Sequence, residues 1–219
     1  APFAEAAGKM MDIATEVTAA GGKIERIDLG GGLGIQYHPD IPAPTPSDLA
    51  AKVLPIFNDR CGDLGISPRL MLEPGRSIVA DTTVMLTSVN VVKRAHVNFV
   101  ATDAGFNVLA RPMLYDSYHH VVAANRAAEP EAETVTVVGP ICETGDILAK
   151  DRKLPALSRG DVLAFLDAGA YGFSMASQYN GQPRPAEVLV TGAVAEVTRR
   201  AEDASSLLAG QRILPRLMK

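Results

Sequence analysis

The first part of the chain alternates helical and strand-like patterns of apolar residues. Apolar side chains recur at helical spacing over residues 3–17, and a glycine pair then predicts the end of that helix. An apolar run over 24–29 predicts a buried strand. A second helix is expected after Ser47, a plausible N-cap, and a second strand over 69–73. This order favours parallel strands joined by helical crossovers.

Beyond residue 80 the pattern changes to short β-rich runs. Strands are expected at 83–93, 98–102, 134–138, 161–166 and 187–197. Short helices are expected at 107–113, 172–177 and 204–208. Strands without long crossovers indicate an antiparallel β-sandwich or β-barrel.

The sequence therefore predicts an α/β part followed by an all-β part. Residues 1–78 are expected to form the last βα units of a (β/α)8 TIM-like barrel, and residues 79–219 a C-terminal β domain. Two strands cannot close a barrel, so the N-terminal strands of that barrel are expected to be absent from this segment.

Composition narrows the class of protein further. The 219 residues are 47% apolar and 21% charged, as in an ordinary globular protein. A net charge of −4 without a long basic run argues against a nucleic-acid surface. No apolar stretch is long enough to span a membrane, so we expect a cytoplasmic protein without a membrane partner. Two distant cysteines and four scattered histidines show no metal-ligand spacing, so no metal site is expected.

Glycine-rich and charged loops follow the two predicted strands. Four glycines lie within residues 30–34, which suits backbone amides that approach a phosphate, although a flexible turn explains the glycines equally well. The second strand is followed by Glu73, Pro74, Gly75 and Arg76. Glu73 could hold a protonated ring nitrogen, while the Gly75 amide and the Arg76 guanidinium suit phosphate or carboxylate. The alternative is a surface ion pair. Parallel strands would direct both loops to one cavity.

Later segments add side chains with possible chemistry. Arg111 and Tyr115 are four residues apart and could share a helix face, or could be solvated loop residues. Cys142, flanked by carboxylates, suits a proton donor better than a nucleophile, although a cysteine after an apolar run is usually buried packing. Tyr171 could be a core ring or could direct its hydroxyl to a ligand.

Five segments jointly carry a resemblance to a known family. They are Asp28-Leu29-Gly30-Gly31-Gly32-Leu33-Gly34, Glu73-Pro74-Gly75-Arg76-Ser77, Arg111-Pro112-Met113-Leu114-Tyr115, Cys142-Glu143-Thr144-Gly145-Asp146 and Ala170-Tyr171-Gly172-Phe173-Ser174-Met175. Together they resemble the alanine-racemase-like pyridoxal-phosphate decarboxylases that act on ornithine, diaminopimelate and arginine. The resemblance covers essentially the whole chain and matches roughly the C-terminal half of such an enzyme.

The resemblance implies a cofactor, a set of site residues and an assembly. Pyridoxal 5'-phosphate would contact Gly31, Gly32, Glu73, Gly75, Arg76 and Tyr171, with Glu73 at the pyridine nitrogen. The substrate would contact Arg76, Arg111, Tyr115, Glu143 and Tyr171. Cys142 resembles the catalytic acid that reprotonates the substrate, and Glu143 resembles the group that recognises its distal amino end. In this family the residues that correspond to Cys142 and Glu143 reach into the active site of the partner subunit, which implies a homodimer.

The resemblance also implies a reaction. The glutamate after the cysteine favours decarboxylation of meso-2,6-diaminopimelate to L-lysine and CO₂, as in lysine biosynthesis. Alternatives are decarboxylation of another basic amino acid or polyamine precursor (ornithine, arginine or carboxynorspermidine) and a non-catalytic regulatory role. The family's Schiff-base lysine lies in a Lys-Ala-Asn context, which no lysine of this chain shows. We therefore expect the segment alone to be inactive.

Overall fold

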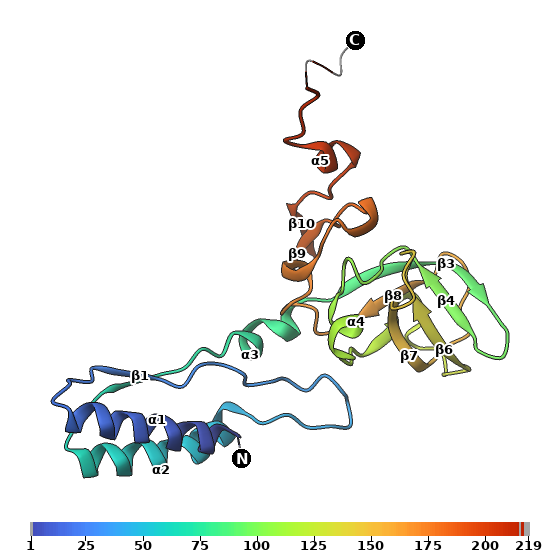
Figure 1. Ribbon diagram of the computed structural model, residues 1–219. Helices are drawn as coiled ribbons and strands as arrows, with labels where there is room; N and C mark the ends of the chain where they lie inside the picture. The colour runs from blue at the N-terminus through green and yellow to red at the C-terminus, as the bar shows by residue number, and fades with distance from the viewer. Residues whose placement is uncertain (1, 215, 217–219) are drawn as a thin grey trace. The chain divides into compact units, whose positions relative to one another are not determined.

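The structure of the protein, a computed structural model, describes residues 2–214 and Arg216 (Figure 1). The chain divides into two compact units, an N-terminal unit Ala1–Thr82 and a C-terminal unit Thr83–Lys219. This division falls a few residues after the expected boundary at residue 78. Each unit has its own buried core and is described separately below.

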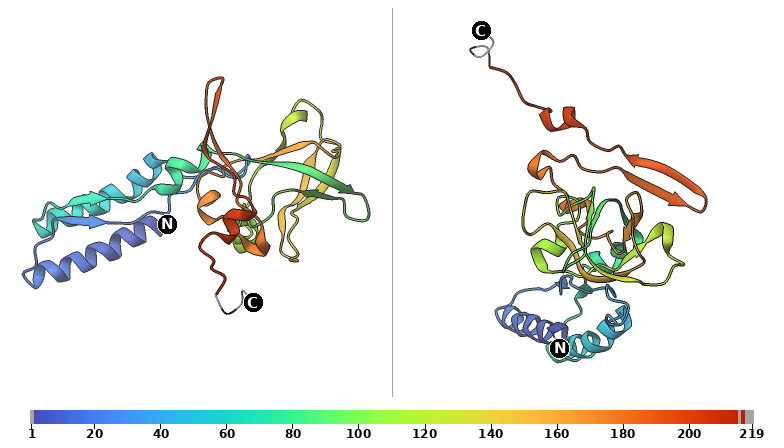
Figure 2. Two further views of the ribbon diagram at one scale, coloured as in Figure 1. Left: turned by 90° about the horizontal axis from the view of Figure 1, so that it is seen from above. Right: turned by 90° about the vertical axis from the view of Figure 1, so that its right-hand side faces the viewer.

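The N-terminal unit contains two long helices and a pair of short strands. Its elements are α1 (Pro2–Ala19), β1 (Arg26–Asp28), α2 (Pro46–Leu64), β2 (Arg69–Met71), α3 (Gly75–Val79) and the 3-10 turn η1 (Ala80–Thr82). The two strands pair in parallel, with Ile27 opposite Leu70, so the predicted parallel arrangement is confirmed. Helices α1 and α2 pack side by side (Figures 1 and 2). Met11 of α1 and Phe57 of α2 share a buried cluster with Ile27 of β1.

The start of α2 differs from the expectation at Ser47. The N-cap is Thr45, whose side chain accepts a hydrogen bond from the Asp48 amide, while the Asp48 carboxylate accepts from the Thr45 amide. This reciprocal capping box satisfies two backbone donors. Pro46 fits the first turn, where an amide hydrogen is not needed. Ser47 therefore lies inside the helix.

The C-terminal unit is built mainly of strands. Its helices and strands are β3 (Met85–Lys93), β4 (Phe99–Thr102), α4 (Arg111–Tyr115), β5 (Val121–Ala123), β6 (Glu133–Val138), β7 (Ile147–Leu154), β8 (Val162–Phe165), β9 (Glu187–Thr191), β10 (Val194–Arg199) and α5 (Ala204–Leu208). Six strands form one sheet in the order β5-β8-β3-β4-β6-β7, and the outer strands β5 and β7 come into contact. The sheet is therefore nearly closed around a core that includes Leu109, Leu148 and Phe165.

Several expectations for this unit need correction. The sheet is not wholly antiparallel, because β4 and β6 pair in parallel. Strand β7 does not stand out in the sequence, because its centre is polar, Lys150-Asp151-Arg152-Lys153, and the short strand β5 is also missing from the prediction. The expected strand 187–197 is a hairpin of β9 and β10 that turns at Gly192, whose φ is +60°.

Of the three expected short helices, one is confirmed and two differ from the prediction. Helix α5 matches the range 204–208, which is confirmed. The helix expected over 107–113 begins only at Arg111, since residues 105–108 form a turn in which the Val108 amide donates to the Gly105 carbonyl. The stretch 172–177 contains only the single 3-10 turn η3 (Phe173–Met175).

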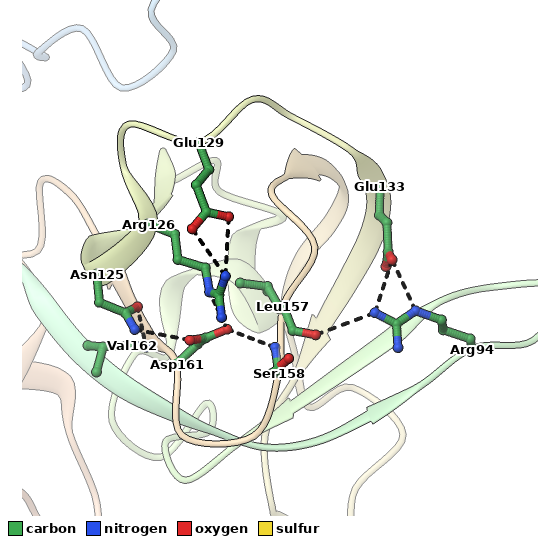
Figure 3. Close-up of polar contacts among 9 residues, drawn as sticks. All are labelled: Arg94, Asn125, Arg126, Glu129, Glu133, Leu157, Ser158, Asp161 and Val162. Carbon is green, nitrogen blue, oxygen red and sulfur yellow. Dashed lines mark hydrogen bonds and ion pairs between the residues drawn. The ribbon is translucent and has the colours of Figure 1, made fainter.

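A buried carboxylate joins the turn before β8 to the 3-10 turn after β5, η2 (Ala124–Arg126) (Figure 3). Asp161 accepts hydrogen bonds from Asn125 Nδ2 at 3.0 Å, Arg126 Nε at 2.8 Å and the Ser158 amide at 2.7 Å. Burial alone would raise the pKa of Asp161, but these donors outweigh it, so the pKa lies below its usual 3.8. The carboxylate therefore stabilises the fold in its ionised form.

We predict that Asp161→Asn destabilises the protein by about 2–4 kcal/mol, because an amide offers one acceptor oxygen and turns a donor toward other donors. Chemical denaturation at pH 7 measures this change. Since the folded pKa lies below 3.8, the wild-type advantage is complete above that pH and is lost as the pH falls through the folded value. Glu129→Gln, which removes the half-exposed partner of the same guanidinium, should cost less than about 1 kcal/mol. Equal losses in the two variants would contradict this assignment.

Candidate functional site

In the N-terminal unit the glycine-rich loop lies directly against the turn that follows β2. The Glu73 amide donates to the Gly30 carbonyl at 2.9 Å, and the Gly30 amide donates to Asp28 Oδ1 at 2.9 Å. A Cβ on Gly31 would lie 2.3 Å from the Glu73 carbonyl oxygen, closer than any side chain tolerates. Gly32 has a φ of +101°, which also favours glycine. The two loops thus form one edge of the unit.

The glycine-rich loop presents backbone donors. Gly31 and Gly32 are both exposed to solvent. Within residues 2–214, no protein group accepts a hydrogen bond from the amides of Gly31, Gly32 or Gly34. Consecutive amides without a protein acceptor, in a loop that has no Cβ to block approach, suit an anionic group such as a phosphate. The geometry therefore favours the phosphate-loop interpretation over a plain flexible turn.

The turn after β2 places an acid and a base close together in sequence. Glu73 is exposed, and Arg76 is partly buried in α3. Ser77 Oγ donates to the Pro74 carbonyl at 2.9 Å, which fixes the turn. The Gly75 amide donates to the Glu73 carbonyl at 2.9 Å, so in this structure that donor serves the turn itself. The side chains of Glu73 and Arg76 remain the groups with which this turn can hold a ligand.

In the C-terminal unit, Arg111 and Tyr171 come together. Arg111 opens α4 and is only 6% exposed, so the interpretation as a solvated loop residue is wrong for it. Its Cζ lies 6.0 Å from the centroid of the Tyr171 ring, within cation–π range. Tyr115, at the other end of the same helix, is 65% exposed. Pro112 lies in the first turn, where proline is tolerated.

Tyr171 occupies an unusual backbone conformation. Its φ is +63°, in the left-handed region that non-glycine residues seldom adopt. The next residue must be glycine, because a Cβ on Gly172 would lie 2.2 Å from the Ala168 carbonyl oxygen. Tyr171 is 40% exposed, so its ring does not belong to the core. A strained backbone that holds a partly exposed phenol is typical of a functional position.

Cys142 and Glu143 lie on an exposed loop that is organised by the buried Asp146. The Asp146 carboxylate accepts from the Ile141 and Phe106 amides, both at 2.7 Å. Burial raises the pKa of Asp146, and those two donors partly offset the effect. Asp146 is buried and holds the loop through these backbone hydrogen bonds, so of the two carboxylates near Cys142 in the sequence only Glu143 is exposed.

The same loop packs on α4. A Cβ on Gly145 would lie 3.2 Å from the Met113 side chain, so the two segments are in close contact.

The two cysteines differ in exposure. Cys142 is exposed, which contradicts the interpretation of this cysteine as a buried core residue, whereas Cys61 of α2 is buried. Burial raises the pKa of the Cys61 thiol.

The structure adds two residues that sequence reasoning does not assign to the site. His119 is fully buried against Arg111, and Asp146 supports the loop of Cys142. The burial of His119 between α4 and β8 has no signature in a single sequence. Within the described part of the chain, no cluster of three or more His, Cys, Asp or Glu could hold a metal ion. None of the helices described is long and apolar enough to cross a membrane.

Comparison with known proteins defines the class. The family described as "Pyridoxal-dependent decarboxylase, C-terminal sheet domain" matches residues 23–169, and the chain belongs to this family. The match begins before the glycine-rich loop and ends just before Tyr171. It therefore includes both loops of the N-terminal unit and the six-stranded sheet of the C-terminal unit.

The particular relatives share one name. The chain is 56% identical over 213 residues to a diaminopimelate decarboxylase of Archaeoglobus fulgidus, covering 97% of this chain and 50% of that protein. It is 47% identical over 220 residues to a diaminopimelate decarboxylase of Methanothermobacter thermautotrophicus, covering 100% and 51% respectively. The crystal structure of diaminopimelate decarboxylase from M. jannaschii in complex with L-lysine superposes with a TM-score of 0.91 at 38% identity, covering 99% of this chain and 50% of that one. The chain thus spans about half the length of these relatives.

Proposed function

We propose that the full-length protein is a pyridoxal-phosphate-dependent decarboxylase that converts meso-2,6-diaminopimelate to L-lysine and CO₂. The observation that carries this proposal is the glycine-rich loop packed on the Glu73 turn, in a chain 56% identical to a diaminopimelate decarboxylase. L-Lysine, the expected product, is the compound named in the complex of the structural relative. The N-terminal unit then corresponds to the last βα units of a (β/α)8 barrel, with the domain boundary near residue 78.

The N-terminal unit would hold the cofactor. The amides of Gly31 and Gly32 suit its phosphate, because they have no acceptor among the described residues and no side chain covers them. The Glu73 carboxylate suits the pyridine nitrogen and would keep it protonated, while Gly75 shapes the turn and the Arg76 guanidinium would contact cofactor and substrate. When bound, pyridoxal phosphate supplies the electron sink that permits loss of the carboxylate.

The C-terminal unit would recognise the substrate. Arg111 offers a buried guanidinium for a substrate carboxylate, and Tyr115 an exposed phenol for the same end of the molecule. Tyr171 would contact both cofactor and substrate. Cys142 Sγ–H would donate the proton that replaces the lost carboxylate at Cα, and the Glu143 carboxylate would bind the distal ammonium group.

A steady-state assay of the full-length protein tests the reaction. With pyridoxal phosphate present, we expect CO₂ release from meso-2,6-diaminopimelate, with kcat/KM at least about 100-fold above that for ornithine, arginine or carboxynorspermidine. A preference for one of those compounds would replace the proposed substrate while the family chemistry remains. No release from any of them would favour a non-catalytic regulatory role.

Gly31→Ala should weaken cofactor binding. The new Cβ would lie 2.3 Å from the Glu73 carbonyl oxygen, so the backbone of Glu73 would have to move. We expect the Kd for pyridoxal phosphate, measured on the full-length protein by absorbance titration, to rise at least about tenfold. Gly34→Ala is the matched control: it lies in the same loop, has open space where a Cβ would lie, and should change the Kd less than about twofold. An unchanged Kd in folded Gly31→Ala protein would remove this loop from the cofactor site.

We further propose a homodimer whose active sites are shared between protomers, with Cys142 and Glu143 contributed to the partner. Both residues lie on an exposed loop, as such a contribution requires. The arrangement is cyclic and two-fold, so each protomer would give and receive the same loop.

Mixing two inactive variants tests this sharing. Arg76→Ala and Cys142→Ala homodimers should each be nearly inactive, because every site lacks one group. After dissociation and random reassociation, about half of the dimers are hybrids with one intact site, so activity should return to about a quarter of wild type. Mixtures without recovery would show that Arg76 and Cys142 act within one protomer.

A further inference from the structure

A fully buried histidine holds the guanidinium of Arg111. His119 Nε2 lies 3.0 Å from Arg111 Nη1, and His119 Nδ1 lies 2.9 Å from the Leu166 carbonyl oxygen. The backbone on both sides of the ring is fixed, because the Leu166 amide donates to the His120 carbonyl beside the β5–β8 pairing. His119 is 0% exposed, so solvent does not compete for either ring nitrogen.

The partners dictate the protonation state of His119. A carbonyl oxygen can only accept a hydrogen bond, so Nδ1 must carry the proton and donate to Leu166. A guanidinium can only donate, so Nε2 must offer its lone pair to Arg111. The ring is therefore neutral. Its surroundings agree: burial lowers the pKa of His119, the nearby charges of Arg111 and Arg152 lower it further, and the hydrogen bond to Leu166 only partly opposes them.

A neutral acceptor has a particular effect on a buried guanidinium. It fixes the orientation of the planar group through one hydrogen bond, and as a neutral group it adds no negative charge beside Arg111. A carboxylate in the place of His119 would orient Arg111 equally well but would compete with an anionic ligand. His119 thus orients the guanidinium without competing with an anion for it.

We infer that His119 is a positioning residue that orients Arg111 for the carboxylate of the substrate. This inference rests on the proposed function, in which Arg111 binds that carboxylate. His119 touches neither substrate nor cofactor in this role and acts through Arg111 alone. Because the contact serves the bound substrate and the transition state alike, its loss should raise KM and leave kcat nearly unchanged.

Three substitutions separate the two hydrogen bonds of the ring. His119→Asn can keep the donor to Leu166 but cannot reach Arg111. His119→Gln can place its amide oxygen near Arg111, so it retains the acceptor. His119→Leu removes both bonds. Neighbouring His120, which is only partly buried and contacts the Tyr118 hydroxyl through Nδ1 at 3.3 Å, provides the matched control His120→Leu.

Steady-state kinetics of the full-length protein with meso-2,6-diaminopimelate is the test. We expect KM to rise about tenfold in His119→Asn and His119→Leu, with kcat within about threefold of wild type. His119→Gln and His120→Leu should keep KM within about threefold. Thermal melting establishes that each variant is folded, and His119→Asn remains informative if His119→Leu does not fold.

The outcomes distinguish failure of this inference from failure of the proposed function. A wild-type KM in folded His119→Asn, or a rise in His119→Gln as large as in His119→Leu, would overturn the positioning role. Arg111→Lys is the reference: if it raises KM while His119→Asn does not, the proposed function stands and only the role of His119 falls. If wild-type protein does not decarboxylate meso-2,6-diaminopimelate, the proposed function falls and the inference falls with it.

Discussion

The contact between the glycine-rich loop and the Glu73 turn, where the cofactor is proposed to bind, depends on the close approach of Gly31 to the Glu73 carbonyl oxygen. A side chain at residue 31 would collide with that oxygen at 2.3 Å. The hydrogen bond from the Glu73 amide to Gly30 locks the same approach from the other direction. Parallel pairing of β1 and β2 brings the two loops to one edge, but only a loop without a Cβ lets them touch. The backbones of the glycine-rich loop and of Glu73 lie side by side for this reason.

The C-terminal unit uses buried polar groups in place of glycine contacts. Asp146 holds the loop of Cys142 through two backbone amides, and His119 holds Arg111 through one ring nitrogen. Each buried group has partners of the complementary type, which is what makes burial of a polar side chain tolerable. The exposed Cys142 loop and the buried Arg111 are thus each held by a buried polar side chain. The hydrogen bonds of Asp146 and His119 therefore fix the positions of the Cys142 loop and of the Arg111 side chain.

The sequence predicted the N-terminal unit better than the C-terminal unit, for physical reasons. Apolar residues recur regularly in helices α1 and α2 and around strand β1, so these elements can be predicted. Strand β7 has the charged run Lys150-Asp151-Arg152-Lys153 at its centre, so its sequence does not resemble a strand. Motifs identify Arg111 and Tyr171 as candidate site residues. The contact between Arg111 and Tyr171 depends on which strands pair, and so does the burial of His119 against Arg111. Strand pairing cannot be predicted from a local sequence pattern.

The contrast between the two cysteines has a practical consequence for labelling. Cys142 is exposed on its loop, while Cys61 is buried in α2 with a raised thiol pKa. In a protomer without its partner a maleimide probe can reach Cys142 but not Cys61, whereas in the proposed homodimer the active site of the partner would cover Cys142.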